Sequence, residues 1–418
     1  MDSEEHSQNQ LSSLQRILSV TDIGLYRRIC VMGIRVKIRK KIKQKNYYRE
    51  LSIVKNKILF RTVSGSYTCN AKYIAEEIIR QKLPYELVWI VNGNVDKFEE
   101  DFPKEIRLVC AKTAQDFYEH ATAKIWIDNE RRNCYIQDGL FKRQEQRYIQ
   151  TFHGSFGIKK TGPDRDLSAT DMEIMEIDSK MIDYLTSNGT WTTAFLKRMF
   201  PGDGKILKFG HPRNDVFFKD GTKIRDKVCT KLNIAPSKNI LLYAPTFRDD
   251  GTMCYSLDYG AVLSGLKGKF GGEWIALARV HPRFADLNGE IIPEGESIVN
   301  ATWYSDMNEL LVAADVTITD YSSSIYDFML SAKPGFIYAE DVDKYEKMRG
   351  LYYPLESTPF PVARNNAQLL ENIKKFDANA YAENVRLFLK SKGSVESGVA
   401  SEKVVELIKK IIAEEEGA

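Results

Sequence analysis

Residues 314–331 read ADVTITDYSSSIYDFMLS, and this stretch decides the fold class. Its first part, Asp315–Thr319, is a short apolar and β-branched run that predicts a buried strand. The run enters a polar loop that begins at Asp320, and a helix is predicted over Ser324–Ser331. Short strands that alternate with helices build parallel α/β sheets, and ligands bind at the carboxyl ends of such strands.

The same pattern recurs along the chain in two halves. The first half contains a predicted helix near Tyr73–Gln81 and strands at Lys57–Val63, Glu86–Val91, Ile106–Cys110, Lys124–Asp128 and Tyr148–Phe152. The second half contains strands at Asn239–Tyr243, Trp274–Val280, Asp315–Thr319 and Gly335–Tyr338. We therefore predict an α/β protein with two Rossmann-like domains that face each other across a ligand cleft.

The domain organisation follows from this pattern and from the charge distribution. We expect a basic amphipathic arm over residues 1–50, an N-terminal domain over 51–207, a C-terminal domain over 208–376 and C-terminal helices over 377–418. The chain has 418 residues, which suits two domains, and its 43% hydrophobic and 28% charged residues describe a globular protein with an ample core. Its six cysteines show no Cys-x-x-Cys pair, which indicates reduced thiols in the cytoplasm.

The arm carries most of the positive charge. Between Arg16 and Arg49 there are eleven Lys or Arg residues and a single acid, Asp22, so the rest of the chain is mildly acidic against a total of +3. That split argues against nucleic acid as a partner. Residues 1–10 are too polar for a signal peptide, and the apolar run Ile29–Ile34 is too short to span a membrane.

Apolar residues interleave with the basic ones between Leu14 and Ile42, which predicts an amphipathic helix on an anionic membrane surface. Two alternatives stay open. The helix could pack on its own domain, or the alternation of Ile34, Val36 and Ile38 could form a short strand.

Three of the five histidines lie beside Gly or Pro at predicted strand ends. His153 follows a strand and precedes Gly154 and Ser155, a position that suits a general base, although a packed histidine would give the same pattern. Lys159 and Lys160 follow in the same loop and could hold a phosphate.

The second half offers candidate phosphate ligands. His281 stands between Arg279 and Arg283, whose guanidinium groups match phosphate oxygens, although a solvated basic loop would look the same. Hydroxyl groups and free N–H groups before a helix also bind anions, or they serve only as helix caps. The residues that form these candidate phosphate sites are Thr246, Arg248, Asp320, Ser322, Ser323 and Ser324.

The segment Gly210–Asp215 lies at the predicted domain junction. We expect His211 to be structural there, and Arg213 and Asp215 to form an ion pair that fixes the hinge. Neither a Gly-x-Gly-x-x-Gly turn after the first strand nor a complete Walker loop occurs.

Taken in order, these motifs resemble the CDP-glycerol glycerophosphotransferase family, which includes teichoic acid primases, teichoic acid polymerases and capsule polymerases. The resemblance covers roughly Lys57 to Phe376. It rests on TFHGSFGIKKTGPD at 151–164, GHPRNDVFF at 210–218, LLYAPTFRD at 241–249, RVHP at 279–282 and the long segment 314–353. This chain has Phe152 where the family commonly has Trp.

The resemblance implies a GT-B fold, with an N-terminal acceptor domain, a C-terminal donor domain, and neither metal nor cofactor. It implies that His153 deprotonates an acceptor hydroxyl, which attacks the β-phosphorus of CDP-glycerol or CDP-ribitol, and that His281 stabilises the diphosphate. The implied acceptor is a lipid-linked or oligosaccharide chain, which would place the protein on the inner face of the bacterial membrane. A nucleotide-sugar glycosyltransferase of the same fold is the alternative, and a homo-oligomer is possible.

Overall fold

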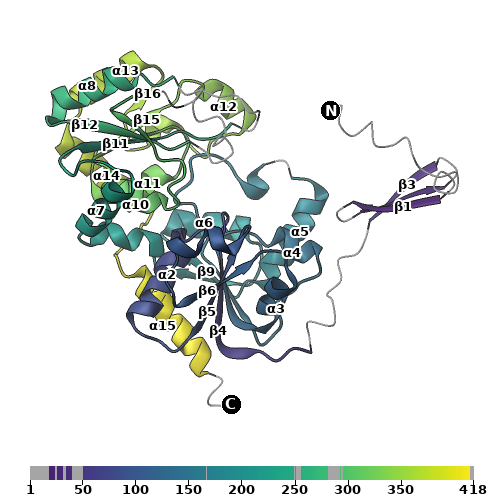
Figure 1. Ribbon diagram of the computed structural model, residues 1–418. Helices are drawn as coiled ribbons and strands as arrows, with labels where there is room; N and C mark the ends of the chain where they lie inside the picture. Colours follow the sequence, from purple (N-terminus) through teal and green to yellow (C-terminus); the bar gives the residue numbers. More distant parts are fainter. Residues whose placement is uncertain are drawn as a thin grey trace.

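The computed structural model describes residues 50–165, 167–248, 250, 256–280, 292 and 295–414, together with three strands nearer the N-terminus. Two lobes make up the main body, and each is a parallel β-sheet with helices on its faces (Figure 1). The predicted architecture of two Rossmann-like α/β lobes is therefore confirmed.

The N-terminal lobe is built on a seven-stranded sheet in the order β10-β9-β8-β7-β4-β5-β6. Its interior strand β4 sends alternate residues to opposite faces, Ile58 and Phe60 into one core and Leu59 into another. The strands are β4 (Val54–Arg61), β5 (Glu86–Val91), β6 (Ile106–Cys110), β7 (Ala123–Asp128), β8 (Arg147–Gln150), β9 (Tyr184–Ser187) and β10 (Lys205–Lys208). The helices are α2 (Cys69–Arg80), α3 (Ala114–Thr122), α4 (Asn133–Gln137), α5 (Ala169–Met181) and α6 (Thr190–Met199).

The C-terminal lobe has a six-stranded parallel sheet in the order β13-β12-β11-β14-β15-β16. Both faces are again buried, because Leu241 and Tyr243 of β11 enter one core while Ile240 and Leu242 enter the other. The strands are β11 (Asn239–Ala244), β12 (Trp274–Ala278), β13 (Ile298–Asn300), β14 (Val316–Thr319), β15 (Gly335–Tyr338) and β16 (Val362–Ala363). The helices are α7 (Thr222–Lys231), α8 (Tyr259–Phe270), α10 (Met307–Ala313), α11 (Ser324–Phe328), α12 (Val342–Met348), α13 (Asn366–Lys375) and α14 (Ala378–Ser391).

The chain crosses between the lobes twice. After β10 it passes through a short helical segment, η5 (Pro212–Phe218), into the C-terminal lobe. The last helix, α15 (Ala400–Ala413), then returns to the N-terminal lobe and packs beside α2 (Figure 1). The buried face of α15 contributes Val404, Val405, Ile408 and Ile411 to the core under β4 and β5.

The helix predicted for the basic arm is wrong. The described part of the arm is a three-stranded antiparallel sheet of β1 (Leu18–Ile23), β2 (Tyr26–Val31) and β3 (Ile34–Arg39). Only two residues, one of them glycine, separate each pair of strands, which is the spacing of a tight hairpin. β-Branched residues at alternate positions of β3 favour a strand, so the pattern with a period of two prevails over the helical stripe.

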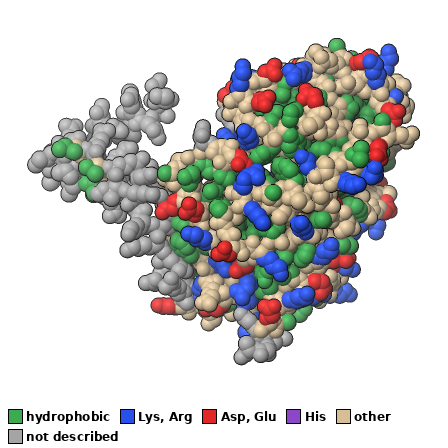
Figure 2. All heavy atoms as spheres, turned by 180° about the vertical axis from the view of Figure 1, so that it is seen from behind, with side chains coloured by type: hydrophobic (Ala, Val, Ile, Leu, Met, Phe, Trp, Pro, Cys, Tyr) green, Lys and Arg blue, Asp and Glu red, His purple; other side chains and the backbone are tan. Residues whose placement is uncertain are grey.

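Acidic and basic side chains are interspersed over the face of the two lobes shown in Figure 2. In the part of the chain that the structure describes, no helix combines the length and the apolar character needed to cross a membrane.

The packing of α15 on the N-terminal lobe should contribute to the stability of the protein. Ile408 is fully buried against the N-terminal lobe, so Ile408→Ala should lower the free energy of unfolding by about 2–5 kcal/mol through the cavity it leaves. Leu387 on α14 is 49% exposed, and Leu387→Ala should change the free energy of unfolding by no more than about 0.5 kcal/mol. Urea denaturation of both variants measures the difference, and equal effects would contradict the packing of α15.

Candidate functional site

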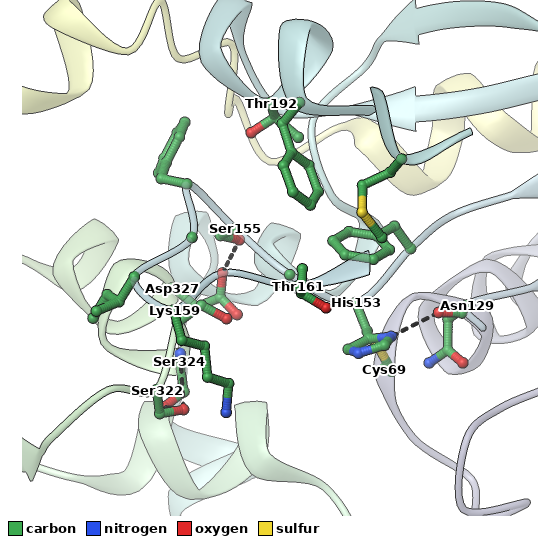
Figure 3. Close-up of a pocket in the computed structure, with 18 of the residues that line it drawn as sticks. Cys69, Asn129, His153, Ser155, Lys159, Thr161, Thr192, Ser322, Ser324 and Asp327 are labelled. Carbon is green, nitrogen blue, oxygen red and sulfur yellow. Dashed lines mark hydrogen bonds between the residues drawn. The ribbon is translucent and has the colours of Figure 1, made fainter. Parts of the chain in front are cut away.

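A cavity of about 500 Å³ lies between the two lobes. The N-terminal lobe supplies the loop after β8, which carries His153, Ser155 and Lys159, while the C-terminal lobe supplies Ser322–Ser324 and Asp327 from the start of α11. Figure 3 shows the His153 imidazole and the serine loop on different walls of this space. The carboxyl ends of both sheets therefore face one site, as the strand-end motifs predicted.

His153 is held by one hydrogen bond that fixes its tautomer. Its Nδ1 lies 2.7 Å from the backbone oxygen of Asn129, which follows β7 (Figure 3). A carbonyl oxygen only accepts, so Nδ1 carries the hydrogen and Nε2 keeps its lone pair. The ring therefore has the form that a general base requires.

The loop under His153 has an unusual backbone conformation. Phe152 has a φ of +53°, in the left-handed region, and its ring stacks on the His153 ring at 5.0 Å between centroids. The buried Asn70 amide donates to the carbonyl oxygens of Thr151 at 3.2 Å and Phe152 at 2.8 Å, and so holds the turn. A Cβ on Gly154 would lie 2.7 Å from the Phe152 ring, so only glycine fits there without a shift of that ring.

The His153 ring is accessible from the cavity, but protein surrounds its other sides. This loss of bulk water lowers the pKa of His153 below its ordinary value, and the positive charges of Arg213 and Lys159 lower it further. The bond to Asn129 opposes the shift without cancelling it. At neutral pH the imidazole is therefore neutral and able to accept a proton.

Ser322, Ser323 and Ser324 line the cavity from the C-terminal lobe. The Ser322 and Ser324 hydroxyl groups lie 2.9 Å apart, and the Ser324 N–H donates to the Ser322 oxygen at 3.3 Å. Asp320 lies behind this loop, buried, where its carboxylate accepts the N–H groups of Thr246 at 2.8 Å and Tyr321 at 2.6 Å. Asp320 and Thr246 thus shape the serine loop from behind, rather than line the cavity.

Arg248 also lies outside the cavity. Its buried guanidinium donates to Asp341 at 2.7 and 2.9 Å and to Asp320 at 2.8 Å. It also packs against the rings of Tyr321 and Tyr345. Two carboxylates thus hold the guanidinium in place, and a contact of Arg248 with a bound substrate stays a prediction.

Ser155, Arg213 and Asp327 form a buried cluster in the wall of the cavity. Arg213 Nε donates to Asp327 Oδ2 at 2.9 Å, and its Nη2 donates to Ser155 Oγ at 3.0 Å. The Ser155 hydroxyl donates to Asp327 Oδ1 at 2.6 Å (Figure 3). Burial alone would lower the pKa of Arg213, but the Asp327 carboxylate outweighs that effect and raises it, so the pair stays ionised.

The expected ion pair between Arg213 and Asp215 is wrong. Asp215 instead accepts the N–H groups of Ala400 at 2.9 Å and Ser401 at 2.7 Å, where a carboxylate stabilises the N-terminal end of α15. His211 is buried, with Nδ1 3.1 Å from Ser155 Oγ. The three residues do lie at the junction, but each binds a different element.

The remaining candidates divide in the same way. Lys159 lines the cavity, whereas Lys160 packs along Gly350 and donates its N–H to the Gly350 carbonyl at 3.0 Å. Arg279 donates to the carbonyl oxygens of Tyr304 and Ser305 at 3.3 and 3.4 Å, and loss of water lowers its pKa to about 10. The predictions for His281 and Arg283 fall outside the described residues.

Several residues of the site were not predicted from the sequence. Asn70, Asn129 and Asp327 all act through bonds to segments far away along the chain, and no local motif marks the two asparagines. Asp327 does have a signal, because it follows Ser324 by three residues in the first turn of α11. The cavity wall near His153 is rich in aromatic side chains, among them Phe152, Phe195, Phe200, Trp191 and Tyr352.

The sequence family described as CDP-glycerol:poly(glycerophosphate) glycerophosphotransferase matches residues 44–410, nearly the whole described body. The chain belongs to this family. The solved structure of the wall teichoic acid polymerase TagF is similar to this chain with a TM-score of 0.76, at 28% identity over 88% of this chain and 93% of that one.

Curated relatives of this chain agree with that placement. The teichoic acid poly(glycerol phosphate) polymerase of Bacillus spizizenii is 30% identical over 84% of this chain and 91% of its own length. The polymerase of the same description from Staphylococcus epidermidis is 29% identical over 90% of this chain. The chain spans only 54% of that second relative, so about half of the relative has no counterpart here.

The Arg213–Asp327 pair can be tested by removing its negative partner. Asp327→Asn leaves a buried guanidinium without its carboxylate and should lower the free energy of unfolding by about 3–5 kcal/mol. Asp343 pairs with Arg364 on the surface, so Asp343→Asn should cost no more than about 1 kcal/mol. Thermal and urea unfolding of the two variants give the comparison, and a small effect of Asp327→Asn would show that the pair is not a structural link.

Proposed function

We propose that this glycerophosphotransferase family member transfers a polyol phosphate, glycerol phosphate or ribitol phosphate, from a CDP-polyol to a hydroxyl group of a growing envelope polymer, with release of CMP. The observation that carries the proposal is the His153 Nε2 lone pair, which is left open by the bond from Nδ1 to Asn129 and is accessible from a cavity between two lobes. The names of the relatives support the same reaction class.

In this mechanism His153 Nε2 takes the proton of the acceptor hydroxyl as that oxygen attacks the β-phosphorus of the donor. The new O–P bond forms while the bond from that phosphorus to the CMP oxygen breaks, and CMP leaves with the electron pair. Phosphoryl transfer needs mainly positioning and charge stabilisation. Lys159 supplies positive charge beside Ser322–Ser324, whose hydroxyl groups can donate to the phosphate oxygens.

The two lobes would then have separate tasks. The acceptor, a lipid-linked or oligosaccharide chain, would enter along the aromatic wall next to His153, and the donor would bind against the serine loop. His281 remains a predicted partner of the diphosphate. In capsule or teichoic acid synthesis these substrates occur at the inner face of the cell membrane, where we place the protein as a peripheral enzyme.

The reaction class is tested by the nucleotide that is released. The purified chain is incubated with an acceptor extract and with CDP-glycerol, CDP-ribitol or a panel of UDP-sugars, and CMP and UDP are measured by chromatography. We expect CMP from a CDP-polyol only. Release of UDP without CMP would instead identify a nucleotide-sugar glycosyltransferase.

His153→Ala tests the assignment of the base. Loss of a general base should lower turnover by about 10²–10⁴-fold, while CDP-glycerol still binds because the donor wall is untouched. Turnover is followed by CMP release and binding by calorimetry. His120→Ala is the matched control for the loss of an imidazole, since His120 is buried beside Asp116 and Trp126 away from this cavity. Full activity of His153→Ala would remove the base from the mechanism.

The arm is proposed to hold the enzyme on an anionic membrane. Ile34 and Val36 of β3 are 70% and 49% exposed, and basic residues are frequent in the same segment. Exposed aliphatic groups among cationic ones suit the boundary between lipid headgroups and acyl chains.

Deletion of residues 1–49 should move the protein from the pellet to the supernatant when it is sedimented with vesicles that contain phosphatidylglycerol. Vesicles of phosphatidylcholine alone are the control, and the full chain should bind them less because each basic residue contributes about 1 kcal/mol only at an anionic surface. Equal sedimentation of the full and the shortened chain would rule out a docking role for the arm.

A further inference from the structure

Glu396 is a buried carboxylate that reaches the domain junction from the segment between α14 and α15. Its side chain is only 2% exposed. Oε2 accepts the backbone N–H of His211 at 3.1 Å, and Oε1 accepts the Asn214 side-chain amide at 2.8 Å. The neighbouring Val395 N–H donates to the Asn188 carbonyl at 2.9 Å, so this segment is anchored at the end of β9. Glu396 therefore binds the start of η5 from a segment that is itself anchored on the N-terminal lobe.

Asn214 connects Glu396 to the cluster in the cavity wall. Its Nδ2 donates to Glu396 Oε1 and also, at 3.1 Å, to Asp327 Oδ1. Its Oδ1 accepts from Asn308 Nδ2 at 3.3 Å, which fixes the orientation of the amide. The Asn214 amide group thus bridges the carboxylates of Glu396 and Asp327. The position of Asp327 therefore depends on Asn214 and, through it, on Glu396.

His211 makes a second connection to the same cluster. The Ser155 hydroxyl has a single hydrogen, and this hydrogen points to Asp327 at 2.6 Å. Ser155 Oγ must therefore accept from His211 Nδ1 at 3.1 Å, so Nδ1 carries the hydrogen of the ring. The same Nδ1 lies 3.8 Å from Glu396 Oε1. The carboxylate thus holds His211 through its backbone N–H, while the ring lies next to the carboxylate without a hydrogen bond to it.

We propose that Glu396 is a positioning residue for the transfer reaction. Through His211 and Asn214 its carboxylate fixes Ser155 on the acceptor wall and Asp327 on the donor wall, so that the His153 loop and the serine loop keep their relative position. This inference rests on the proposed function. It gives the C-terminal segment a part in the site, although Glu396 itself touches no substrate.

The protonation of Glu396 offers a specific readout. Burial raises its pKa to about 7, the negative charge of Asp327 adds to the rise, and the bonds from Asn214 and His211 oppose it. The titratable groups that face Glu396 are His211 and Asp327, and Arg213 stands next to both. A proton on Glu396 removes one acceptor oxygen, so positioning should be lost as the pH falls through about 7.

The effect can be separated from that of His153 by pH. The pKa of His153 is lowered, so its protonation cuts turnover only at a pH below the ordinary histidine range. Wild type should therefore lose kcat in two steps on acidification, the first near pH 7. Glu396→Gln has one acceptor oxygen at every pH, so its profile should keep only the lower step.

The experiment measures kcat and KM for CDP-glycerol between about pH 5.5 and 8.5. We expect Glu396→Gln to lower kcat at pH 8 by about ten- to a hundredfold with KM within about twofold, because misplacement affects the reaction more than donor binding. Glu402→Gln removes a carboxylate that is 51% exposed on α15, and its profile should superimpose on wild type. Glu396→Asp keeps the charge and should recover part of kcat together with the step near pH 7.

An unchanged profile for Glu396→Gln in an active wild-type background would overturn the inference alone. A wild-type chain that releases no CMP from any CDP-polyol would overturn the proposed function, and this inference with it. If circular dichroism shows that Glu396→Gln does not fold, Asn214→Ala decides. It removes the bridge to Asp327 and leaves Glu396 in place, and it should also lower kcat with KM kept; wild-type kcat in that variant would contradict the role.

Discussion

The buried ion pair between Arg213 and Asp327 is the interaction on which the rest of the site depends. Arg213 belongs to the segment that joins the lobes, and Asp327 lies in the first turns of the helix that follows the serine loop. Taking two charges out of water costs several kcal/mol per ion unless the remaining hydrogen-bonding groups are satisfied. Here Ser155 and Asn214 donate the remaining hydrogen bonds to the Asp327 carboxylate. The carboxylate can therefore be buried only when the His153 loop, η5 and α11 are all in place.

The same relation between the lobes is enforced by apolar packing. Phe156 and Ile158 follow the His153 turn, yet both are buried in the core of the C-terminal lobe, where Phe156 meets Tyr326 and Phe388 edge-on. At a second contact between the lobes, the buried Lys72 of α2 donates to Asp306 and Glu309 of the C-terminal lobe at 2.5 and 2.6 Å. The loop that carries His153 therefore belongs to one lobe by sequence and to the other by packing.

The sequence predicts the buried strands well and the site only in part. Glu86–Val91 and Gly335–Tyr338 are found with the predicted bounds, because continuous apolar runs bounded by polar turns are the signature of strands buried on both faces. Ile106–Cys110 is also found with the predicted bounds, although it is a partly exposed edge strand. Short strands at or near the sheet edges, such as β10 and β16, have too few buried residues to give that signal. The helix predicted for the arm is wrong for a different reason. Its apolar residues fit a helical stripe and a strand alternation equally, and the β-branched side chains favour the strand.

The roles of charged residues were the least predictable part, and the physical reason is distance along the chain. Arg248 and Arg213 look alike in sequence, since each follows a predicted strand or junction and stands near an anion motif. Arg248 meets carboxylates 72 and 93 positions away, and Arg213 meets one 114 positions away. A local motif shows that a guanidinium is present but not whether a carboxylate from another element already occupies it. Only the fold supplies that second partner.

This distribution of buried charge also explains why the site is polar where the core could have been apolar. Replacing a buried ion pair by apolar groups of similar volume is often neutral or stabilising, so such pairs give little net stability. They instead fix the relative positions of the groups involved. A carboxylate that accepts from Arg213, Ser155 and Asn214 permits one arrangement of those groups, whereas apolar contacts permit many. Phosphoryl transfer between two bound substrates depends on such an arrangement more than on any single reactive group. The polar junction therefore keeps His153 at a set distance from the serine loop on the other side of the cavity.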